Sequence, residues 1–260
     1  MSSRNTSSYL AFKSEAERLT NLVVLISHAV PVLKRVITSP AASALVPIKP
    51  ADNFPHDKSS APLLTTWAVD YGQDLAHVVV LSVFSQFEAY VRGALVEIYD
   101  RQGGANAFLS LATKQAERYW NTAPSIVSEA KNKLLDSHDQ RKADKYRKYS
   151  RTLVEAGFSF PPDLLSVYGA KQLLRKVKPN AFRAGEIPDL LSDALLLKVT
   201  STERSMYSDI KELRNLVAHG NRPKLTVHEA IKKTTALRKW ASKIDQHIAD
   251  HFLVLARYAR

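Results

Sequence analysis

The sequence contains no cysteine, which removes a set of chemistries from consideration. Disulfide bonds, thiolate nucleophiles and cysteine-ligated zinc are excluded, and this composition suits a reducing cytoplasm. Glycine is scarce, at 8 of 260 residues, and neither a Rossmann nor a Walker glycine-rich loop is present. Strand signals are nearly absent, because no alternating apolar runs flank an Asn-Gly or Asp-Gly turn. The sequence therefore predicts an all-α protein.

The sequence implies neither a membrane span nor secretion. The apolar stretch from Leu22 to Leu33 contains polar residues and Pro31, and it is shorter than the roughly 20 residues that a span requires. It does not match a signal peptide, because Lys34 follows it and acidic residues precede it. We expect a first helix from about Ser14 to Ile37, kinked at Pro31, in a cytoplasmic protein with no membrane partner.

We interpret residues 1–260 as a single helical domain. Residues 38–63 contain five prolines and no helical periodicity, which indicates an irregular surface loop between two helices. Thr65 or Thr66 is expected to cap the next helix, which runs to about Arg101 with a continuous apolar stripe. The expected core is an up-down bundle of four long helices. Residues from about 102 to 195 add basic helices in the middle third.

The formal net charge is +12, from 37 Lys and Arg against 25 Asp and Glu. This balance favours a polyanionic partner, with nucleic acid first and an anionic membrane surface second. Two basic segments with interleaved tyrosines would suit a surface that tracks phosphates and stacks bases, although such segments can also be only solvated helix faces. The candidate substrate-binding residues in these segments are Arg141, Lys142, Lys145, Lys148, Arg175 and Lys176.

The apolar spacing of the segment from Lys211 to Gly220 predicts the end of an amphipathic helix, which begins after Ser201 or Thr202. Gly220 suits the left-handed conformation that closes a helix. Arg214 and His219 would point about 140° apart on an ideal helix. They could converge only if the backbone loosens at Gly220, or if a second copy of the chain supplies the facing pair.

The sequence Arg-Asn-Leu-Val-Ala-His at residues 214–219 resembles the signature of RNase-type (RiboL-PSP-HEPN-like) HEPN domains, in which Arg and a polar residue precede His. These all-helical modules occur in prokaryotic toxins, defence systems and RNA-processing factors, and many are metal-independent endoribonucleases that dimerise. The resemblance implies catalytic roles for Arg214, Asn215 and His219, RNA as substrate, a homodimer and no cofactor. It also implies an antitoxin or a defence-system protein as a further partner.

The residue types of this motif suit RNA cleavage because RNA supplies its own nucleophile, the 2′-hydroxyl. His219 can transfer protons near neutral pH, and Arg214 offers a planar fork to the charge on phosphorus. Asn215 can hold the phosphate or orient the imidazole. The expected products are a 2′,3′-cyclic phosphate and a 5′-hydroxyl.

Two alternatives to catalysis stay open. The same helices could form a non-catalytic module that binds RNA, a nucleotide or a partner protein. In a purely structural role, Arg214 would pair with an acid on its own helix, while His219 would cap the helix terminus. The acids available for that pairing are Glu203, Asp209 and Glu212.

Glu88 and Arg92 are candidate supporting residues on the helix that ends near Arg101. Their i,i+4 spacing suits a solvated surface ion pair. Alternatively, Glu88 faces the cleft that the motif is expected to line, and there it orients Arg214 or Arg92.

The last helix is predicted to begin at a capping box formed by Thr226 and Glu229, and to run to about Leu255. His247 and His251 lie one turn apart on it, a spacing that can bind metal. No third ligand is in view. Solvated histidines are therefore the favoured interpretation, and no metal site is predicted.

Overall fold

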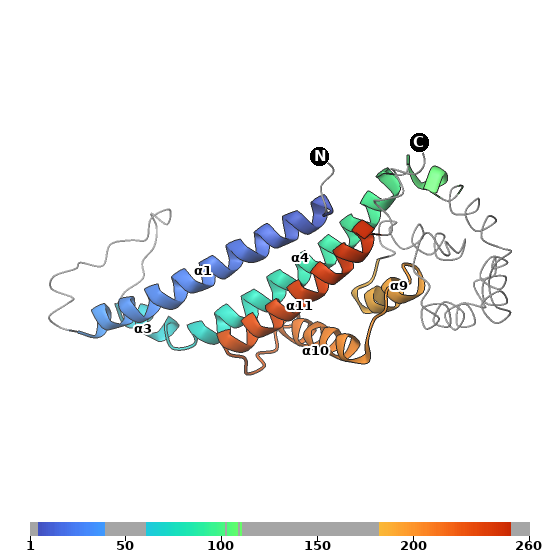
Figure 1. The fold of residues 1–260 in the computed structure, drawn as a ribbon. Helices are drawn as coiled ribbons and strands as arrows, with labels where there is room; N and C mark the ends of the chain where they lie inside the picture. The colour runs from blue at the N-terminus through green and yellow to red at the C-terminus, as the bar shows by residue number, and fades with distance from the viewer. Residues whose placement is uncertain (1–4, 40–60, 102, 109, 111–181, 251–260) are drawn as a thin grey trace.

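The computed structural model describes residues 5–39, 61–101, 103–108, 110 and 182–250. Every regular element in these residues is helical, so the predicted all-α class is confirmed for the part of the chain that is described. In chain order the elements are α1 (Ser7–Thr38), α3 (Ala61–Trp67), α4 (Tyr71–Arg101), the 3-10 helix η2 (Ala184–Glu186), α9 (Ile187–Asp193), α10 (Ser201–Ala218) and α11 (Val227–Ile248) (Figure 1).

The helix α4 is central, and its contacts give the directions of its neighbours. Near the start of α1, the Ser8 hydroxyl donates to Glu97 near the end of α4 over 2.6 Å, so these helices run antiparallel. The α11 helix runs parallel to α4, because His77 contacts the Pro223 carbonyl at one end and Tyr90 donates to the Ala241 carbonyl further along. Figure 1 shows these long helices side by side.

An aromatic cluster joins four helices at the middle of the core. Phe87 of α4 stacks on Trp240 of α11 with ring centroids 5.4 Å apart. Phe12 of α1 meets Phe87 edge-on, and Tyr207 of α10 packs against Phe87 and Trp240. Aromatic pairs of this kind add about 0.5–1.5 kcal/mol beyond their buried area. The cluster therefore fixes how α10, which carries the motif, sits on α4.

Local sequence signals placed two helix ends correctly. Thr226 and Glu229 form both hydrogen bonds of a capping box at the start of α11. Gly220 follows α10 with φ of +80°, the left-handed conformation that glycine adopts without a steric penalty. At the start of α10 the cap is Thr200, which forms a second capping box with Glu203. The predicted start, after Ser201 or Thr202, was close to this position.

The predicted start of α1 at about Ser14 was wrong. The helix begins at Ser7, and Thr6 caps it by accepting a hydrogen bond from the Tyr9 N–H. Thr6 is itself held by the buried carboxylate of Asp245, which accepts from its hydroxyl over 2.5 Å. That partner is on α11, so no local sequence signal announces the cap.

The prediction that Thr65 or Thr66 caps the long second helix was also wrong. Both residues lie within the short α3, which starts at Ala61 inside the stretch predicted to be irregular, and α4 begins only at Tyr71. Their hydroxyls donate to the carbonyls of Ala61 and Pro62 one turn earlier. Such back-bonding occupies the hydroxyl within a helix, whereas a cap would accept from the N–H groups of the next turn.

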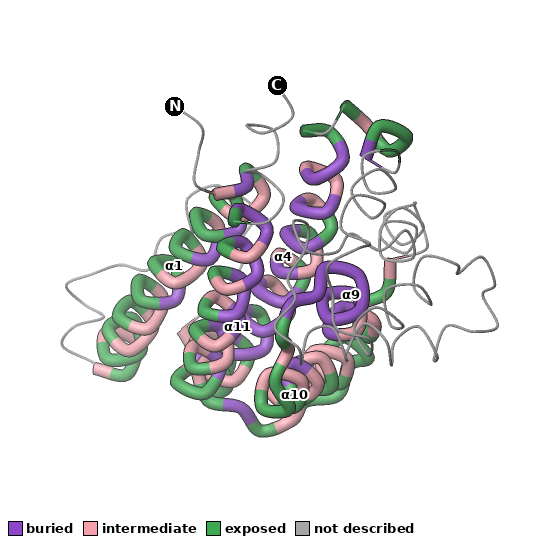
Figure 2. The backbone as a smooth tube through the Cα atoms, turned by 45° about the vertical axis from the view of Figure 1, so that its right-hand side comes forward, coloured by how far each residue is buried: buried purple, intermediate pink, exposed green. Residues whose placement is uncertain are grey.

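Two of the described helices, α1 and α4, are long and apolar enough to span a membrane by length and composition alone. The most apolar window of α4 is 50% buried within the chain, which is typical of a core helix, whereas that of α1 is only 6% buried. Figure 2 shows the difference, with α1 mostly in the exposed and intermediate colours. The described residues therefore leave most of the apolar window of α1 unburied.

Candidate functional site

Arg214 lies on the face of α10 that packs against α4. Its Nη2 forms an ion pair with Glu88 Oε2 at 3.3 Å, and its guanidinium carbon lies 5.5 Å from the centre of the Phe84 ring. Phe84 and Glu88 are one turn apart on α4, so a single helix face supplies both contacts. The Arg214 side chain keeps 30% of its surface exposed. The guanidinium is therefore fixed in position and still open to solvent on one side.

The electrostatics of this pair are those of a partly buried carboxylate. Burial raises the pKa of Glu88 above its ordinary value of 4.5, and the charge of Arg214 lowers it only in part. Burial also raises the pKa of the nearby Tyr207, whose hydroxyl donates to the Ala184 carbonyl over 2.7 Å. Tyr207 thus serves as a packing and hydrogen-bonding group, and it is a poor proton donor at neutral pH.

Asn215 adds a second polar side chain to the arrangement. Its side-chain oxygen accepts a hydrogen bond of 3.0 Å from Arg214 Nη1. A carboxamide that accepts through its oxygen has its NH₂ group available as a donor. Arg214 and Asn215 together present N–H donors, which is the chemistry that recognises a phosphate.

His219 is exposed and lies at the C-terminal cap of α10. Its backbone N–H donates to the Asn215 carbonyl over 3.0 Å. No hydrogen bond joins its imidazole to Arg214 or to any other described residue. Within one chain, then, the structure brings Arg214, Asn215 and Glu88 together, and it leaves His219 apart from them at the helix end.

The loop that follows His219 is fastened to the start of α4, which the sequence did not predict. The Gln73 amide donates to the carbonyls of Arg222 and Pro223, both at 3.3 Å, and His77 Nε2 lies 2.9 Å from the Pro223 carbonyl. Arg222 also forms an ion pair with Asp74. In the sequence, the i,i+4 spacing of Gln73 and His77 places both side chains on one face of a helix. That spacing does not show which segment of the chain they bind.

Several candidate contacts were not formed. Arg92 is exposed, and among the described residues Glu88 pairs with Arg214 and not with Arg92. The acids on α10 that a structural role for Arg214 would use are engaged elsewhere or exposed. Glu203 binds Lys243 at 2.6 Å, Glu212 accepts from Ser208 at 3.4 Å, and Asp209 is exposed.

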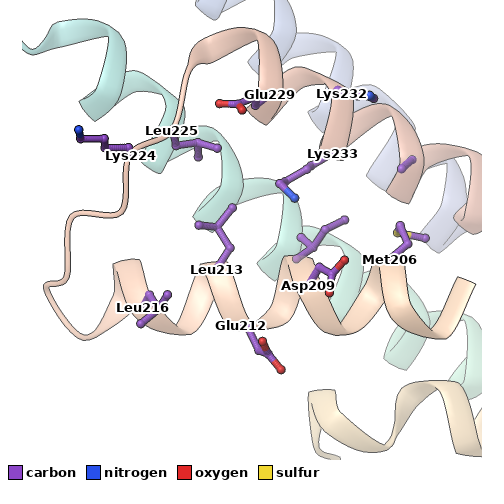
Figure 3. A pocket seen from close by; sticks show the side chains of 12 residues that line it. Met206, Asp209, Glu212, Leu213, Leu216, Lys224, Leu225, Glu229, Lys232 and Lys233 are labelled. Carbon is purple, nitrogen blue, oxygen red and sulfur yellow. The ribbon is translucent and has the colours of Figure 1, made fainter. Parts of the chain in front are cut away.

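A groove of about 680 Å³ lies between α10 and α11, and Figure 3 shows the side chains that line it. Its α10 wall carries the acidic Asp209 and Glu212, whereas its α11 wall carries Lys232 and Lys233 together with the acidic Glu229. None of the candidate catalytic residues Arg214, Asn215 and His219 lines it. The groove is therefore separate from the Arg214 contacts on α4.

His247 of the last helix lies within the described part of the chain. It is half-buried and its Nε2 lies 2.7 Å from the Leu195 carbonyl, so the prediction of a freely solvated histidine is wrong for His247. Among the described residues, no group of three or more His, Asp or Glu side chains is arranged to hold a metal ion. His251 lies outside these residues.

The candidate substrate-binding residues Arg141, Lys142, Lys145, Lys148, Arg175 and Lys176 all lie outside the described residues.

No protein-family model, curated protein sequence or solved structure shows significant similarity to the chain.

Proposed function

We propose that this chain is a metal-independent endoribonuclease of the HEPN type, acting as a homodimer in the cytoplasm as a toxin or antiviral-defence effector. One observation carries the proposal. The motif arginine is fixed by Glu88 and Phe84 with 30% of its side chain exposed, on the helix whose end presents the exposed motif histidine. An arginine held in this way suits a phosphate that carries growing negative charge.

The arrangement of the helices supports the HEPN-type bundle that is part of the proposal. Contacts such as Ser8 with Glu97 make α1 antiparallel to α4, while Tyr90 with Ala241 belongs to the parallel pair of α4 and α11. Glu203, at the start of α10, binds Lys243 near the end of α11, so α10 runs opposite to both. Among the four long helices of the described residues, α1, α4, α10 and α11, the direction thus alternates in chain order, as in an up-down bundle.

The proposed reaction is an internal transesterification of RNA. The 2′-oxygen forms a bond to phosphorus, the bond from phosphorus to the 5′-oxygen breaks, and the products are a 2′,3′-cyclic phosphate and a 5′-hydroxyl. His219 of one chain accepts the proton of the 2′-hydroxyl, and His219 of the second chain donates a proton to the leaving 5′-oxygen. Arg214 and Asn215 donate hydrogen bonds to the phosphate oxygens.

The other predicted residues take indirect roles in this proposal. Glu88 is a positioning residue, because it binds the guanidinium and not the substrate. The six candidate substrate-binding residues hold the RNA strand through its phosphates; they are Arg141, Lys142, Lys145, Lys148, Arg175 and Lys176. An antitoxin or defence-system protein would control the enzyme.

The test is RNA cleavage by His219→Ala, with His228→Ala as the matched control, because His228 is an exposed histidine on α11 that is not part of the motif. His219→Ala removes both the general base and the general acid of the dimer, so it should slow cleavage by at least about 10²–10⁴-fold, the usual contribution of one such group. His228→Ala should cleave as the wild type does. EDTA should leave the wild-type rate unchanged, and the products should carry cyclic phosphate ends.

Two results would contradict the proposal. Activity that EDTA abolishes and a divalent ion restores would exclude the metal-independent mechanism. RNA that is bound equally by the wild type and His219→Ala, and cleaved by neither, would favour the non-catalytic binding module.

In co-expressed mixed dimers of Arg214→Ala and His219→Ala chains, partial recovery of cleavage would support a composite site.

A further inference from the structure

The end of α10 has few buried contacts of its own. The last buried residue of this helix is Ile210, and no residue between Ile210 and Leu225 is buried. This interval contains the whole motif, from Arg214 to His219, and most of the loop that follows it. Helix ends with few buried side chains open readily. The places of the motif side chains therefore depend on contacts with another element.

The helix α4 supplies such contacts at two places. Phe84 and Glu88 hold the guanidinium of Arg214. At the start of α4, Gln73 and His77 hold the loop after the motif. Going along α4, these four residues are four, seven and four positions apart, spacings that return to nearly the same direction on a helix. One face of α4 therefore contacts both the first part of the motif and the loop behind it.

The attachment of the loop depends on donors from side chains of α4. The Gln73 amide donates to the carbonyls of Arg222 and Pro223, and His77 Nε2 lies 2.9 Å from the Pro223 carbonyl. A carbonyl oxygen can only accept, so the hydrogen of the neutral His77 ring is on Nε2. His77 is 7% exposed, so loss of this partner would leave a buried polar group unpaired. The nearby ion pair of Arg222 with Asp74 is exposed and contributes less.

His219 lies where the chain leaves α10. Its φ of −89° and ψ of 13° are no longer helical, and Gly220 follows with φ of +80°. The N–H groups of His219, Gly220 and Asn221 each donate over 3.0 Å to carbonyls near the end of α10. The attached carbonyls of Arg222 and Pro223 come three and four residues after His219. The chain at His219 is thus held by α10 on one side and by α4 on the other.

We infer that Gln73 and His77 are positioning residues for the motif histidine. They attach the loop after His219 to α4, the helix that also fixes Arg214, so that one helix sets the places of both motif side chains. The inference deepens the proposed function and rests on it for the effect on catalysis. Gln73 and His77 do not contact the substrate, and they act through the backbone of the loop.

The first measurement follows His219 in the full chain without RNA. His77→Leu removes the donor and keeps a bulky side chain at the buried position. It should speed hydrogen exchange at the amides of His219, Gly220 and Asn221 by about tenfold, as expected for the loss of one hydrogen bond. It should also shift the NMR signals of the His219 imidazole, which are assigned by their absence in His219→Ala.

Two further variants separate positioning from a general loss of stability. His77→Gln keeps an N–H donor within reach of the Pro223 carbonyl, and it should restore the wild-type exchange and signals. His247→Leu is the matched control, because it removes a comparable contact of 2.7 Å with the Leu195 carbonyl, which precedes α10. It should lower stability without changing exchange at the end of α10, where amides exchange by local opening.

The second measurement is RNA cleavage. His77→Leu should lower kcat by about 10²-fold, because displacement of a catalytic group weakens stabilisation of the transition state. KM should stay unchanged, because binding of the ground state is not affected. Gln73→Glu should act in the same direction, since a carboxylate has no N–H to donate to the two carbonyls. His77→Gln and His247→Leu should keep the wild-type kcat.

The outcomes separate the inference from the proposed function. Unchanged amide exchange and His219 signals in His77→Leu, or an unchanged kcat, would overturn the inference even though RNA is cleaved. Equal losses of kcat in His77→Leu, His77→Gln and His247→Leu would also overturn it, because lost stability would then be the cause. If the wild type cleaves no RNA, changes in exchange and signals that His77→Gln reverses would uphold the positioning of His219 and remove the proposed enzyme.

Discussion

The helices α1 and α4 are close in length, at 32 and 31 residues, and their most apolar windows have mean hydropathies of 1.4 and 1.3. Yet the window of α4 is 50% buried and that of α1 is 6% buried. Hydropathy measures how strongly a segment favours leaving water. It does not say which partner covers the segment. The neighbours of α4 belong to this chain, whereas no residue of α1 after Val23 is buried by the described residues.

The largest expected effect tests this contrast directly. Phe87→Ala, in the aromatic core on α4, should lower the free energy of unfolding by about 3–5 kcal/mol because it leaves a cavity. Leu25→Ala on α1 should change the stability of the monomer by no more than about 0.5 kcal/mol. Urea unfolding at several protein concentrations measures both.

The concentration dependence sharpens the comparison. The loss from Phe87→Ala should be the same at every protein concentration. Leu25→Ala should show no such loss at any concentration, and a loss that grows with concentration would show that a second copy of the chain covers Leu25. Equal and concentration-independent losses would mean that α1 is packed within its own chain, as α4 is.

A smaller effect is expected where α1 is attached to the core. Thr6→Val removes the helix cap and a hydrogen bond to the buried Asp245, which together should cost about 2 kcal/mol. Hydrogen exchange should show the amides of α1 losing protection while those of α4 keep theirs. Thr20→Val is the matched control, because the Thr20 hydroxyl bonds only to the Ala16 carbonyl of its own helix. Equal loss in α4 would show that the two helices unfold as one unit.

Features with local causes could be predicted from the sequence. The capping box at Thr226 and Glu229 and the closing Gly220 were predicted because each depends on residues within one helix turn. The all-α class followed from missing strand signals. The start of α1 was missed because Asp245, which holds the cap residue, is far away in the sequence.

At the candidate site, too, features with local causes could be predicted from the sequence, and contacts between distant segments could not. The motif made Arg214, Asn215 and His219 the candidate residues, and their spacing predicted that Arg214 and His219 point apart on one helix. The pairing of Glu88 with Arg214 was one of two interpretations, since i,i+4 spacing fits Arg92 equally well and only packing on α10 selects Arg214. The attachment of the loop by Gln73 and His77 joins segments that no local pattern connects.

The smallest effect concerns the pH dependence of the α1 attachment. The contacts that hold α4 at Phe87 are apolar and do not titrate, whereas α1 is held at Asp245. Burial raises the pKa of Asp245 above its ordinary value of 3.8, and the hydrogen bonds from Thr6 and Asn5 lower it only in part. The folded state therefore binds this proton more tightly than the unfolded state does. The stability from this group is present at low pH and is lost as pH rises from 3.8 through the raised pKa.

The measurement is urea unfolding of the wild type and Asp245→Asn across this pH range. The asparagine side chain has no proton to lose, so the stability advantage of the wild type over Asp245→Asn should shrink as pH rises. Phe87→Ala should instead stay below the wild type by a constant amount, because the lost contact does not titrate. If the advantage of the wild type over Asp245→Asn grows with pH, then Thr6 and Asn5 stabilise the carboxylate by more than burial destabilises it. The attachment of α1 would then be an ordinary charge-stabilised contact that strengthens when Asp245 ionises.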